Sequence, residues 1–544
     1  MADLTRLRTA RLLDLPRDRP FPLWMLFPVF FVAVFLSHLT LLRLPYYWDE
    51  AGYYIPAAFD FLRTGSLIPF STMSNAHPPL PSLYLALWWK TSGFTPMVTR
   101  TSMCVVSALA LLAVYRLAMG LTGRAQTAAA TVLLTAIYPV WFAQSTLAHA
   151  DMFAAAATLW GLAFALSDEA VSSGVTSRPW AAVACFSLAA LAKETAIVTP
   201  LALALWEAWL ALRDSGPEEA RRRWTDAARW LLPAIPLVLW YGYHRYKTGY
   251  IFGNPEYLRY NATATISPIR ILVAFGHRLL HVTAHMNLFV PVMCMVAAMM
   301  LDPLPEANGN PRPRVAWTAQ ARIYAVILAN LMLFSVLGGA LLTRYLLPLY
   351  PLVLLLCVNT FRRRVRYWPG LVLFSAVAFL GGILINPPYR FAPEDNLAYR
   401  DVIVLHQQAI RRIVRTYPNA VVLTAWPASD ELQKPELGYV RKPVPVVRIE
   451  NFSLAEIQKA AQSNEPFSAA LAFSTKYDPP NLALSLGPRN EALDSQFFDF
   501  HRDLPPEAIA RLLGGDLAWE GERNGQWAAV LHFNRAQAAA LHGP

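Results

Sequence analysis

The chain of 544 residues is 55% hydrophobic and only 15% charged, and its mean hydropathy is +0.33. These values exclude a soluble protein of this length and predict a polytopic membrane protein. The net charge of +11 does not indicate nucleic-acid binding, because the basic residues form short clusters between apolar runs instead of following one soluble face.

The first predicted elements are a basic segment at residues 1–21 and an apolar run at 22–42. No small-residue cleavage site follows this run, which predicts an uncleaved signal anchor with its basic end in the cytoplasm. Crossing a bilayer takes about 20 apolar residues, and on that measure about eleven runs are candidates. They lie near residues 22–42, 97–118, 125–142, 152–167, 180–192, 196–212, 230–243, 286–301, 322–341, 345–360 and 369–386.

The connections between these runs predict the topology of a transmembrane domain at residues 22–386. Arginine-rich connections alternate with arginine-poor ones, and the rich ones are expected on the cytoplasmic side. The apolar stretch 180–212 is too long for one ordinary span. Counting it as two helices, with Lys193 and Glu194 at the outer tip, keeps the cluster at 221–223 on the cytoplasmic side. The chain after residue 386 is then outside.

The composition changes near residue 387, and residues 387–544 alternate short β-type runs with helical stretches. Strands are predicted at "AVVLTAW", "PVPVVRI", "ALAFS" and "WAAVLHF". Helices are predicted over 399–417 and after Ser453, where Glu456 completes a capping-box pattern. The sequence thus predicts a small extracytoplasmic α/β domain after the helical membrane domain.

A long first outer loop, residues 43–96, contains the most unusual polar motif of the chain. The motif "YYWDEAGYY" places Asp49 and Glu50 before an amphipathic stretch that is expected to lie at the headgroups. Asp49 is either the N-cap of that interfacial helix, with Glu50 favouring the helix dipole, or a base that faces a lipid-borne substrate. The residues of the motif alone leave both interpretations open.

Three further outer-edge motifs contain candidate substrate-binding residues. His77 precedes a Pro-Pro helix start and is either an interfacial turn residue or part of a site. Lys193 and Glu194 interrupt an apolar hairpin; they form a mutual ion pair, or Lys193 extends to phosphate headgroups, or both bind substrate. Arg344, followed by Tyr345, is either an interfacial anchor or a phosphate ligand.

The remaining polar candidates carry weaker signals. Asp151 follows His149 in a very short outer loop and is an obvious N-cap for the next span. Histidines recur at helical spacing at 277, 281 and 285, so an amphipathic helix is favoured and metal ligation is geometrically possible. The loop 244–270 contains Arg245, Lys247, Tyr257 and Arg259, which either form an anion-binding rim or are solvated. All four cysteines lie in apolar stretches and indicate no disulfide framework.

The motifs "WDE", "HPPLPSLY", "AKE" and "TRYLLPLYP" together resemble GT-C fold glycosyltransferases. The resemblance is to the protein O-mannosyltransferase group and the aminoarabinose transferases that modify lipid A, and it covers about residues 1–386. It implies a helical membrane domain of GT-C type and a sugar donor linked through phosphate to a polyprenol. It fixes no cofactor; some relatives use a divalent metal cation at the phosphate, and the sequence leaves open whether this chain does. The acceptor class stays open among a protein, lipid A, a glycolipid and a polysaccharide.

The resemblance also implies roles for individual residues. Asp49 matches the acid that deprotonates the acceptor hydroxyl, and Glu50 is its neighbour in the acidic pair of the family. Arg344 and Lys193 are the residues expected to stabilise the phosphate of the leaving group. The other predicted substrate-binding residues are His77, Asp151, Glu194 and Tyr345.

Two other functions are considered. A secondary transporter or flippase for a lipid-linked or anionic substrate would line a pathway with the same charged residues, but transporters show internal repeats and bind near the midplane of the bilayer. An assembly scaffold built around the outer domain would not need Asp49. The sequence therefore favours an enzyme of the cytoplasmic membrane that acts on the outer face, with a cytoplasmic N-terminus.

Overall fold

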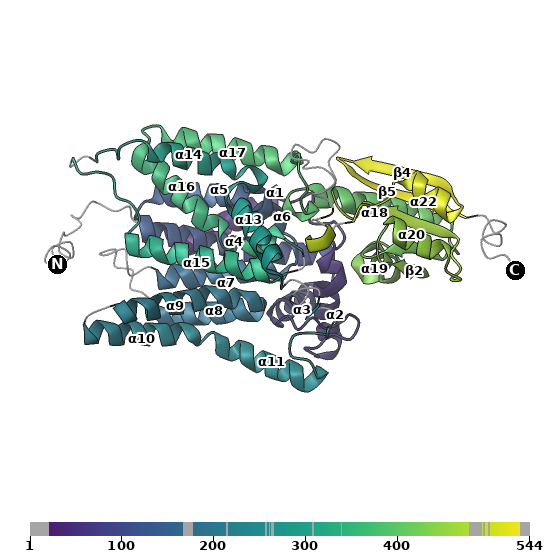
Figure 1. Cartoon of the computed structure of the whole chain (residues 1–544), viewed down its shortest axis with the longest axis horizontal. Coiled ribbons are helices and arrows are strands. Elements are labelled where there is room, and N and C mark those ends of the chain that lie inside the picture. The colour runs from purple at the N-terminus through teal and green to yellow at the C-terminus, as the bar shows by residue number, and fades with distance from the viewer. Residues whose placement is uncertain are drawn as a thin grey trace.

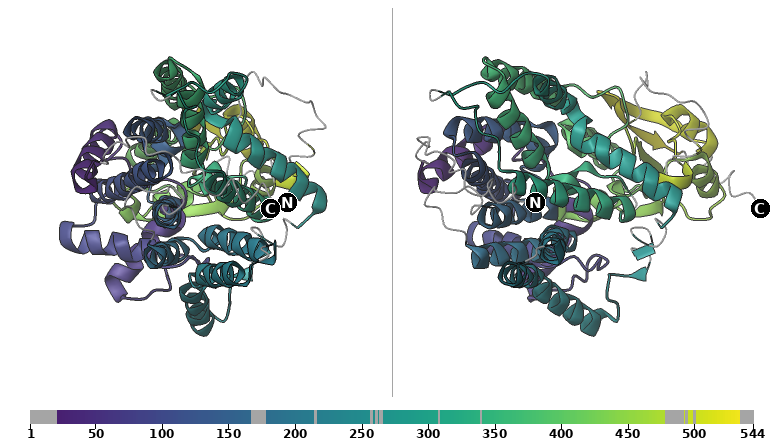
Figure 2. Two further views of the ribbon diagram at one scale, coloured as in Figure 1. Left: turned by 90° about the vertical axis from the view of Figure 1, so that its left-hand side faces the viewer. Right: turned by 60° about the vertical axis from the view of Figure 1, so that its left-hand side comes forward.

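The structure is a computed structural model, and it describes residues 21–533 except 167–177, 214–215, 256–257, 260–261, 263–265, 307–308, 339, 478–491, 493–494 and 499–500. A helical part and a smaller part with a five-stranded sheet lie end to end (Figure 1). Viewed from the helical end, many helices are seen along their axes, with the sheet part behind them (Figure 2). The predicted basic segment 1–21 lies outside the described residues except for Phe21.

The helical part ends with α17, and short helical turns are labelled η. Its elements are α1 (Leu23–Ser37), η2 (Glu50–Tyr54), α2 (Ile55–Thr64), α3 (Leu80–Ser92), α4 (Pro96–Thr122), α5 (Ala125–Ile137), α6 (Pro139–Gln144), α7 (Ala150–Ala165), α8 (Pro179–Ala192), η4 (Glu194–Ile197), α9 (Val198–Arg213), α10 (Pro217–Leu231), α11 (Ala234–Thr248), α13 (Pro268–Thr283), η6 (His285–Asn287), α14 (Phe289–Met299), α15 (Trp317–Val336), η7 (Thr343–Leu346), α16 (Tyr350–Arg364) and α17 (Trp368–Leu384).

Several of these helices are long and apolar enough to cross a membrane. Within the described residues there are three: α4, the continuous stretch Glu194–Arg213, and α15. The pair Pro268–Asn287 and Phe289–Met299 passes the same test together but bends by 99°, and five shorter helices are also apolar. Length and composition thus identify three or four spans, and the sequence-based number of about eleven stays a prediction.

The two ends of the helical part carry different connections. Helix α9 ends and α10 begins at the end away from the sheet part, whereas α2 and α3 of the first loop lie at the end next to it (Figure 1). The long apolar stretch at 180–212 is divided as predicted, because α8 ends at Ala192 and Lys193 has extended backbone, with φ −150° and ψ 124°. The first loop, the tip at Lys193 and the sheet part therefore lie near one another.

Helices α7 and α8 pack against each other through small residues. A Cβ atom built on Gly161 of α7 would lie 2.4 Å from Cε1 of Phe186, a fully buried ring of α8. Glycine at this position therefore sets how closely the two helices approach.

Gly161→Ala is expected to destabilise the protein by about 1–3 kcal/mol, because the added methyl group overlaps the Phe186 ring in a packed interior. Thermal unfolding in detergent measures the effect. Gly276→Ala is the matched control, since nothing lies within 4 Å of a Cβ there, and it is expected to leave stability unchanged or slightly higher. Equal melting temperatures for the two variants would contradict this packing.

The sheet part has the order β2-β1-β3-β5-β4, with β2, β1 and β3 parallel and β3, β5 and β4 antiparallel. Its elements are η8 (Pro393–Asp395), α18 (Ala398–Thr416), β1 (Val422–Ala425), α19 (Ala428–Gln433), η9 (Pro435–Leu437), β2 (Val446–Ile449), α20 (Leu454–Ala461), β3 (Ala469–Phe473), α22 (Pro506–Leu513), β4 (Asp516–Arg523) and β5 (Gln526–His532). The predicted α/β character is confirmed, and the predicted strands correspond to β1, β2, β3 and β5.

Two details of this part differ from the prediction. Strand β4 was not predicted, because it is an edge strand whose side chains are mostly exposed and whose sequence, "DLAWEGER", has no regular apolar alternation. Helix α20 begins after Ser453 as predicted, but within the described structure the Ser453 side chain makes no capping hydrogen bond. Glu456 instead accepts a hydrogen bond from the backbone N–H of Glu450.

Candidate active site

A cavity of about 980 Å³ lies where the first loop, the Lys193 tip and the sheet part meet. Its polar and aromatic lining comes from segments far apart in the sequence: Tyr47, Trp48, Asp49, Tyr53, Tyr54, Asn75, His77, Lys193, Glu194, Thr195, Tyr241, Phe252, Phe334, Arg344, Tyr345, Arg390, Phe391, Glu394, Trp426, Thr475, Lys476 and Tyr477. Both parts of the chain thus contribute to one cavity.

The cavity brings together most of the site residues predicted from the sequence. Those that line it are Asp49, His77, Lys193, Glu194, Arg344 and Tyr345. In the described structure, Glu50 and Asp151 are outside the lining. Asp151 is nevertheless close to the site, because it contacts two of the lining cations.

Arg344 is the centre of the charged residues. Its side chain is only 2% exposed, and its Nη1 donates to Oε2 of Glu394 at 2.5 Å, while Nη2 donates to the carboxylate of Asp49. Nε lies 3.4 Å from Oδ2 of Asp151. Arg344 is therefore a buried side chain that contacts three carboxylates, and not an interfacial anchor. The Asp49 carboxylate binds Arg344 and makes no capping hydrogen bond to the following helical turn in the described structure.

Lys193 is held by an ion pair and an aromatic ring. Its Nζ donates to Oδ1 of Asp151 at 2.5 Å and lies 3.8 Å from the centre of the Tyr345 ring. Of the alternatives that the sequence leaves open, the mutual ion pair of Lys193 and Glu194 is not the one observed, because Lys193 pairs with Asp151 and Glu194 with His77. The predicted N-cap role of Asp151 is wrong, because the N-cap of α7 is His149 and the Asp151 carboxylate binds Lys193.

Glu194 pairs with His77 across the cavity. Nδ1 of His77 lies 2.9 Å from Oε2 of Glu194. The His77 ring stacks on Tyr54 with centroids 5.9 Å apart, and the Tyr53 ring meets it edge-on at 5.6 Å. His77 is thus part of an aromatic wall of the cavity and not only a turn residue before a helix.

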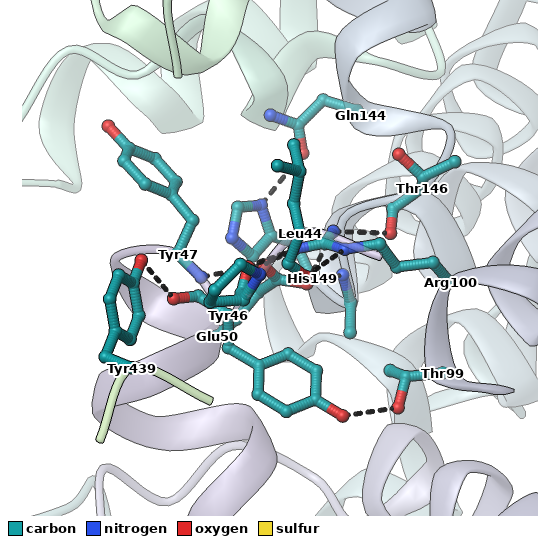
Figure 3. A network of polar contacts seen from close by, with 12 residues as sticks. Leu44, Tyr46, Tyr47, Glu50, Thr99, Arg100, Gln144, Thr146, His149 and Tyr439 are labelled. Carbon is teal, nitrogen blue, oxygen red and sulfur yellow. Dashed lines mark hydrogen bonds and ion pairs between the residues drawn. The ribbon is translucent and has the colours of Figure 1, made fainter. Parts of the chain in front are cut away.

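Glu50 has no exposed surface and is bound on all sides (Figure 3). Its two carboxylate oxygens accept hydrogen bonds from Arg100 at 3.0 and 3.3 Å, from the N–H of Tyr47 at 2.9 Å and from the N–H of Ala148 at 2.7 Å. Such a carboxylate has no surface from which to meet a substrate. The predicted catalytic role of Glu50 is therefore not supported, and its neighbour Asp49, 34% exposed, is the carboxylate that faces the cavity.

The sequence analysis did not identify two charged residues that bind the predicted site residues, Arg100 and Glu394. Arg100 lies inside a predicted apolar span, and an arginine there is a signal that favours a named partner. Glu394 follows the last predicted span in "FAPEDN" and carries no such signal. Its side chain is 4% exposed, and burial raises the pKa of Glu394 to about 8, although Arg344 opposes the shift.

The histidines at 277, 281 and 285 and the basic residues of the loop 244–270 do not line the cavity within the described residues. Helix α13 ends at Thr283, so His285 leaves the predicted helical face and bonds instead to Asp395 at 2.9 Å. Among the described residues there is no group of three or more His, Cys, Asp or Glu side chains placed to hold a metal ion. Arg245, Lys247 and Arg259 are not in the lining within the described part of the chain, and Tyr257 lies outside the described residues.

Comparisons with known proteins are consistent with this architecture. Residues 76–240 match the family model described as dolichyl-phosphate-mannose-protein mannosyltransferase. This segment includes His77, Asp151, Lys193 and Glu194, whereas Asp49 and Arg344 lie outside it. No curated protein gives a significant match.

The structure is similar in fold, over almost its whole length, to a solved crystal structure. ArnT from Cupriavidus metallidurans bound to undecaprenyl phosphate has 16% sequence identity and a TM-score of 0.54, over 95% of this chain and 99% of that one. The apo state of the same protein has 16% sequence identity and a TM-score of 0.52, again over 95% of this chain and 99% of that one. The S. cerevisiae Pmt1-Pmt2 complex bound to its sugar donor has 18% identity over 46% of this chain and 36% of that one, with a TM-score of only 0.34.

These findings confirm the predicted fold class. The chain has a mostly helical membrane part of the GT-C fold and a small C-terminal α/β domain. The resemblance to GT-C fold glycosyltransferases that the sequence motifs indicated is confirmed by the match over residues 76–240 and by the fold.

Proposed function

We propose that this chain is a membrane glycosyltransferase that moves a sugar from a polyprenyl-phosphate donor to a hydroxyl acceptor on the outer face of the cytoplasmic membrane. The observation that carries the proposal is the cavity in which Asp49 lies beside the buried cations Arg344 and Lys193, next to an aromatic wall. The family match and the fold of a protein bound to undecaprenyl phosphate support it.

The geometry supports a single displacement. A hydroxyl is a poor nucleophile until a base takes its proton, and among the described carboxylates of the cavity lining the Asp49 side chain is the most exposed, at 34% against 24% for Glu194 and 4% for Glu394. The acceptor oxygen forms a bond to the anomeric carbon while the bond from that carbon to the phosphate oxygen breaks, and Asp49 receives the acceptor proton. Attack opposite the phosphate predicts inversion at the anomeric carbon.

The leaving group is a polyprenyl phosphate, whose negative charge needs cationic partners in a site shielded from water. Lys193 and Arg344 are the buried cations that line the cavity, so we assign them to the phosphate. Both already bind carboxylates, and the phosphate must therefore share or replace those partners. The aromatic wall at Tyr53, Tyr54 and His77 is suited to stacking against a sugar ring.

The C-terminal domain is proposed to take part in acceptor recognition. Trp426 meets Trp48 edge-on with centroids 5.0 Å apart, and Lys476 and Tyr477 line the same cavity. A protein, lipid A, a glycolipid or a polysaccharide acceptor would enter past these side chains. The proposed orientation places the N-terminus in the cytoplasm and this domain outside.

Lys193→Met is expected to weaken the binding of undecaprenyl phosphate by about 10- to 100-fold, the range expected for losing one hydrogen bond to a charged group. Binding to the purified full-length protein in nanodiscs measures this. Lys459→Met, at a mostly exposed lysine of α20, is the matched control and should bind like the wild type. Affinity within twofold of wild type for Lys193→Met would contradict its assignment to the phosphate.

Mass spectrometry of lipids and glycans tests the function itself. A strain that lacks the chain is compared with strains complemented by the wild type or by Asp49→Asn. We expect one sugar modification to be absent without the chain and restored only by the wild type. If the chain were a flippase, the reconstituted protein would transport a lipid-linked substrate without forming a new covalent product. If it were a scaffold, the Asp49→Asn variant would restore the sugar modification as well. Either result would reject the proposal.

A further inference from the structure

Glu394 is a buried carboxyl of the cavity for which the proposed transfer step has no use. It lies in η8, between the last apolar helix α17 and α18 of the C-terminal domain. Its Oε2 accepts from Arg344 at 2.5 Å, whereas its Oε1 is buried and has no hydrogen-bond partner among the described residues. The next residue, Asp395, binds His285 at 2.9 Å and the hydroxyl of Thr343, which fixes the segment in place.

The charges around Glu394 do not balance when every carboxyl is ionised. Three carboxylates, Asp49, Asp151 and Glu394, contact two cations, Arg344 and Lys193. His149, 3.4 Å from Arg344, adds no charge, because burial together with Arg344 and Lys193 holds its pKa well below the usual value. The cluster then carries one excess negative charge, and a donor phosphate would bring another into the same buried space.

We propose that Glu394 is neutral when the donor phosphate is bound, taking up a proton from the surrounding water wherever it is ionised in the free protein, so that Arg344 exchanges its contact with this carboxyl for a contact with the phosphate. The inference rests on the proposed function, since it concerns the phosphate of the proposed donor. The proton returns to water when the lipid phosphate leaves. Glu394 acts through Arg344 and is therefore a positioning residue.

The electrostatic surroundings of Glu394 agree with this role. Burial raises its pKa to about 8, Arg344 opposes this shift, and Asp49, Asp395 and Asp151 add to it. A bound anion nearby raises the pKa further. Among the residues that the structure describes, the titratable and charged groups that act on Glu394 and its partner Arg344 include Asp49, Asp151, Asp395, His149, Lys193, Tyr47 and Tyr345.

The raised pKa of Glu394 determines how the affinity for an anion depends on pH. Below about pH 8 free Glu394 already holds its proton, and the affinity for an anion is constant. Above that pH the proton must be taken up on binding, so affinity is expected to fall by about tenfold per pH unit. Without a titratable group at position 394 this fall disappears.

Calorimetric titration of the full-length protein with undecaprenyl methyl phosphate tests the proposal. This diester is a suitable probe because its single charge does not change between about pH 7 and 9.5, whereas a phosphate monoester titrates near neutral pH. Repeating the titration in buffers of different ionisation enthalpy gives the number of protons taken up. Near pH 9 we expect almost one proton for the wild type and none for Glu394→Gln, which should bind with an affinity independent of pH.

Two further variants complete the design. Glu394→Asp keeps a titratable carboxyl and is expected to keep the proton uptake, and Glu465→Gln, at an exposed carboxylate of the C-terminal domain, should behave as the wild type. Wild-type protein that binds the diester without proton uptake overturns the proposal, whether or not any variant folds. Proton uptake that persists in folded Glu394→Gln also overturns it, whereas wild-type protein that binds no polyprenyl phosphate at any pH rejects the proposed function itself.

Discussion

Replacing Asp49 by Asn is expected to lower the rate of sugar transfer by about 10²- to 10⁴-fold, the usual contribution of a positioned general base. The amide has nearly the same shape as the carboxylate but cannot accept the proton of the acceptor hydroxyl. Initial rates measured with purified protein in proteoliposomes, a polyprenyl-phosphate sugar and a saturating acceptor separate this effect from binding.

The binding of the donor should survive the Asp49→Asn substitution. Asp49 shares Arg344 with Glu394 and Asp151, and removing one negative charge from this cluster does not weaken its affinity for an anion. The matched control is Asp302→Asn, at an exposed position remote in sequence from the lining residues. Transfer by Asp49→Asn within about tenfold of the wild type would remove Asp49 from the role of base.

A different outcome is expected at the neighbouring residue. Glu50→Ala should destabilise the protein by about 3–5 kcal/mol, because it leaves the fully buried guanidinium of Arg100 without its counter-charge. The backbone N–H groups of Tyr47 and Ala148 lose their acceptor as well. The loss is measured as a shift of the unfolding midpoint in a lipid–detergent mixture.

A double substitution separates structure from chemistry at Glu50. Removing both charges, with Glu50→Leu and Arg100→Met, leaves no unpaired buried ion and should recover much of the stability lost in Glu50→Ala. We expect transfer activity to follow the amount of folded protein in both variants. A Glu50→Ala protein that is as stable as the wild type but inactive would instead place Glu50 in the reaction.

The candidate site shows what sequence patterns predict well. Charged residues are unfavourable in an apolar membrane segment, so Lys193, Glu194 and Arg344 stood out without any structure. All three line the cavity together with Asp49 and His77. Their partners were not predictable in the same way, because Lys193 lies next to Glu194 in sequence yet binds Asp151, and Glu194 binds His77.

The fold also has elements that the sequence predicts and elements that it does not. Strands β1, β2, β3 and β5 were predicted because each carries a run of β-branched or apolar residues. Edge strand β4 has no comparable pattern and is identified by its pairing with β5. Helix α13 was expected to continue through His285 by its spacing, but the chain turns at Met286, where φ is +48°.

By itself the amino-acid sequence determined the class of the protein, the helical and α/β parts, and the set of unusual charges, because hydropathy and local periodicity are properties of consecutive residues. Which carboxylate faces the cavity was decided only by the tertiary structure. Asp49 and Glu50 are adjacent and chemically alike, but Arg100 and two backbone N–H groups enclose Glu50, while Arg344 and the cavity meet Asp49. Glu394 reaches the same arginine from a segment 50 residues away, a contact that no local pattern encodes.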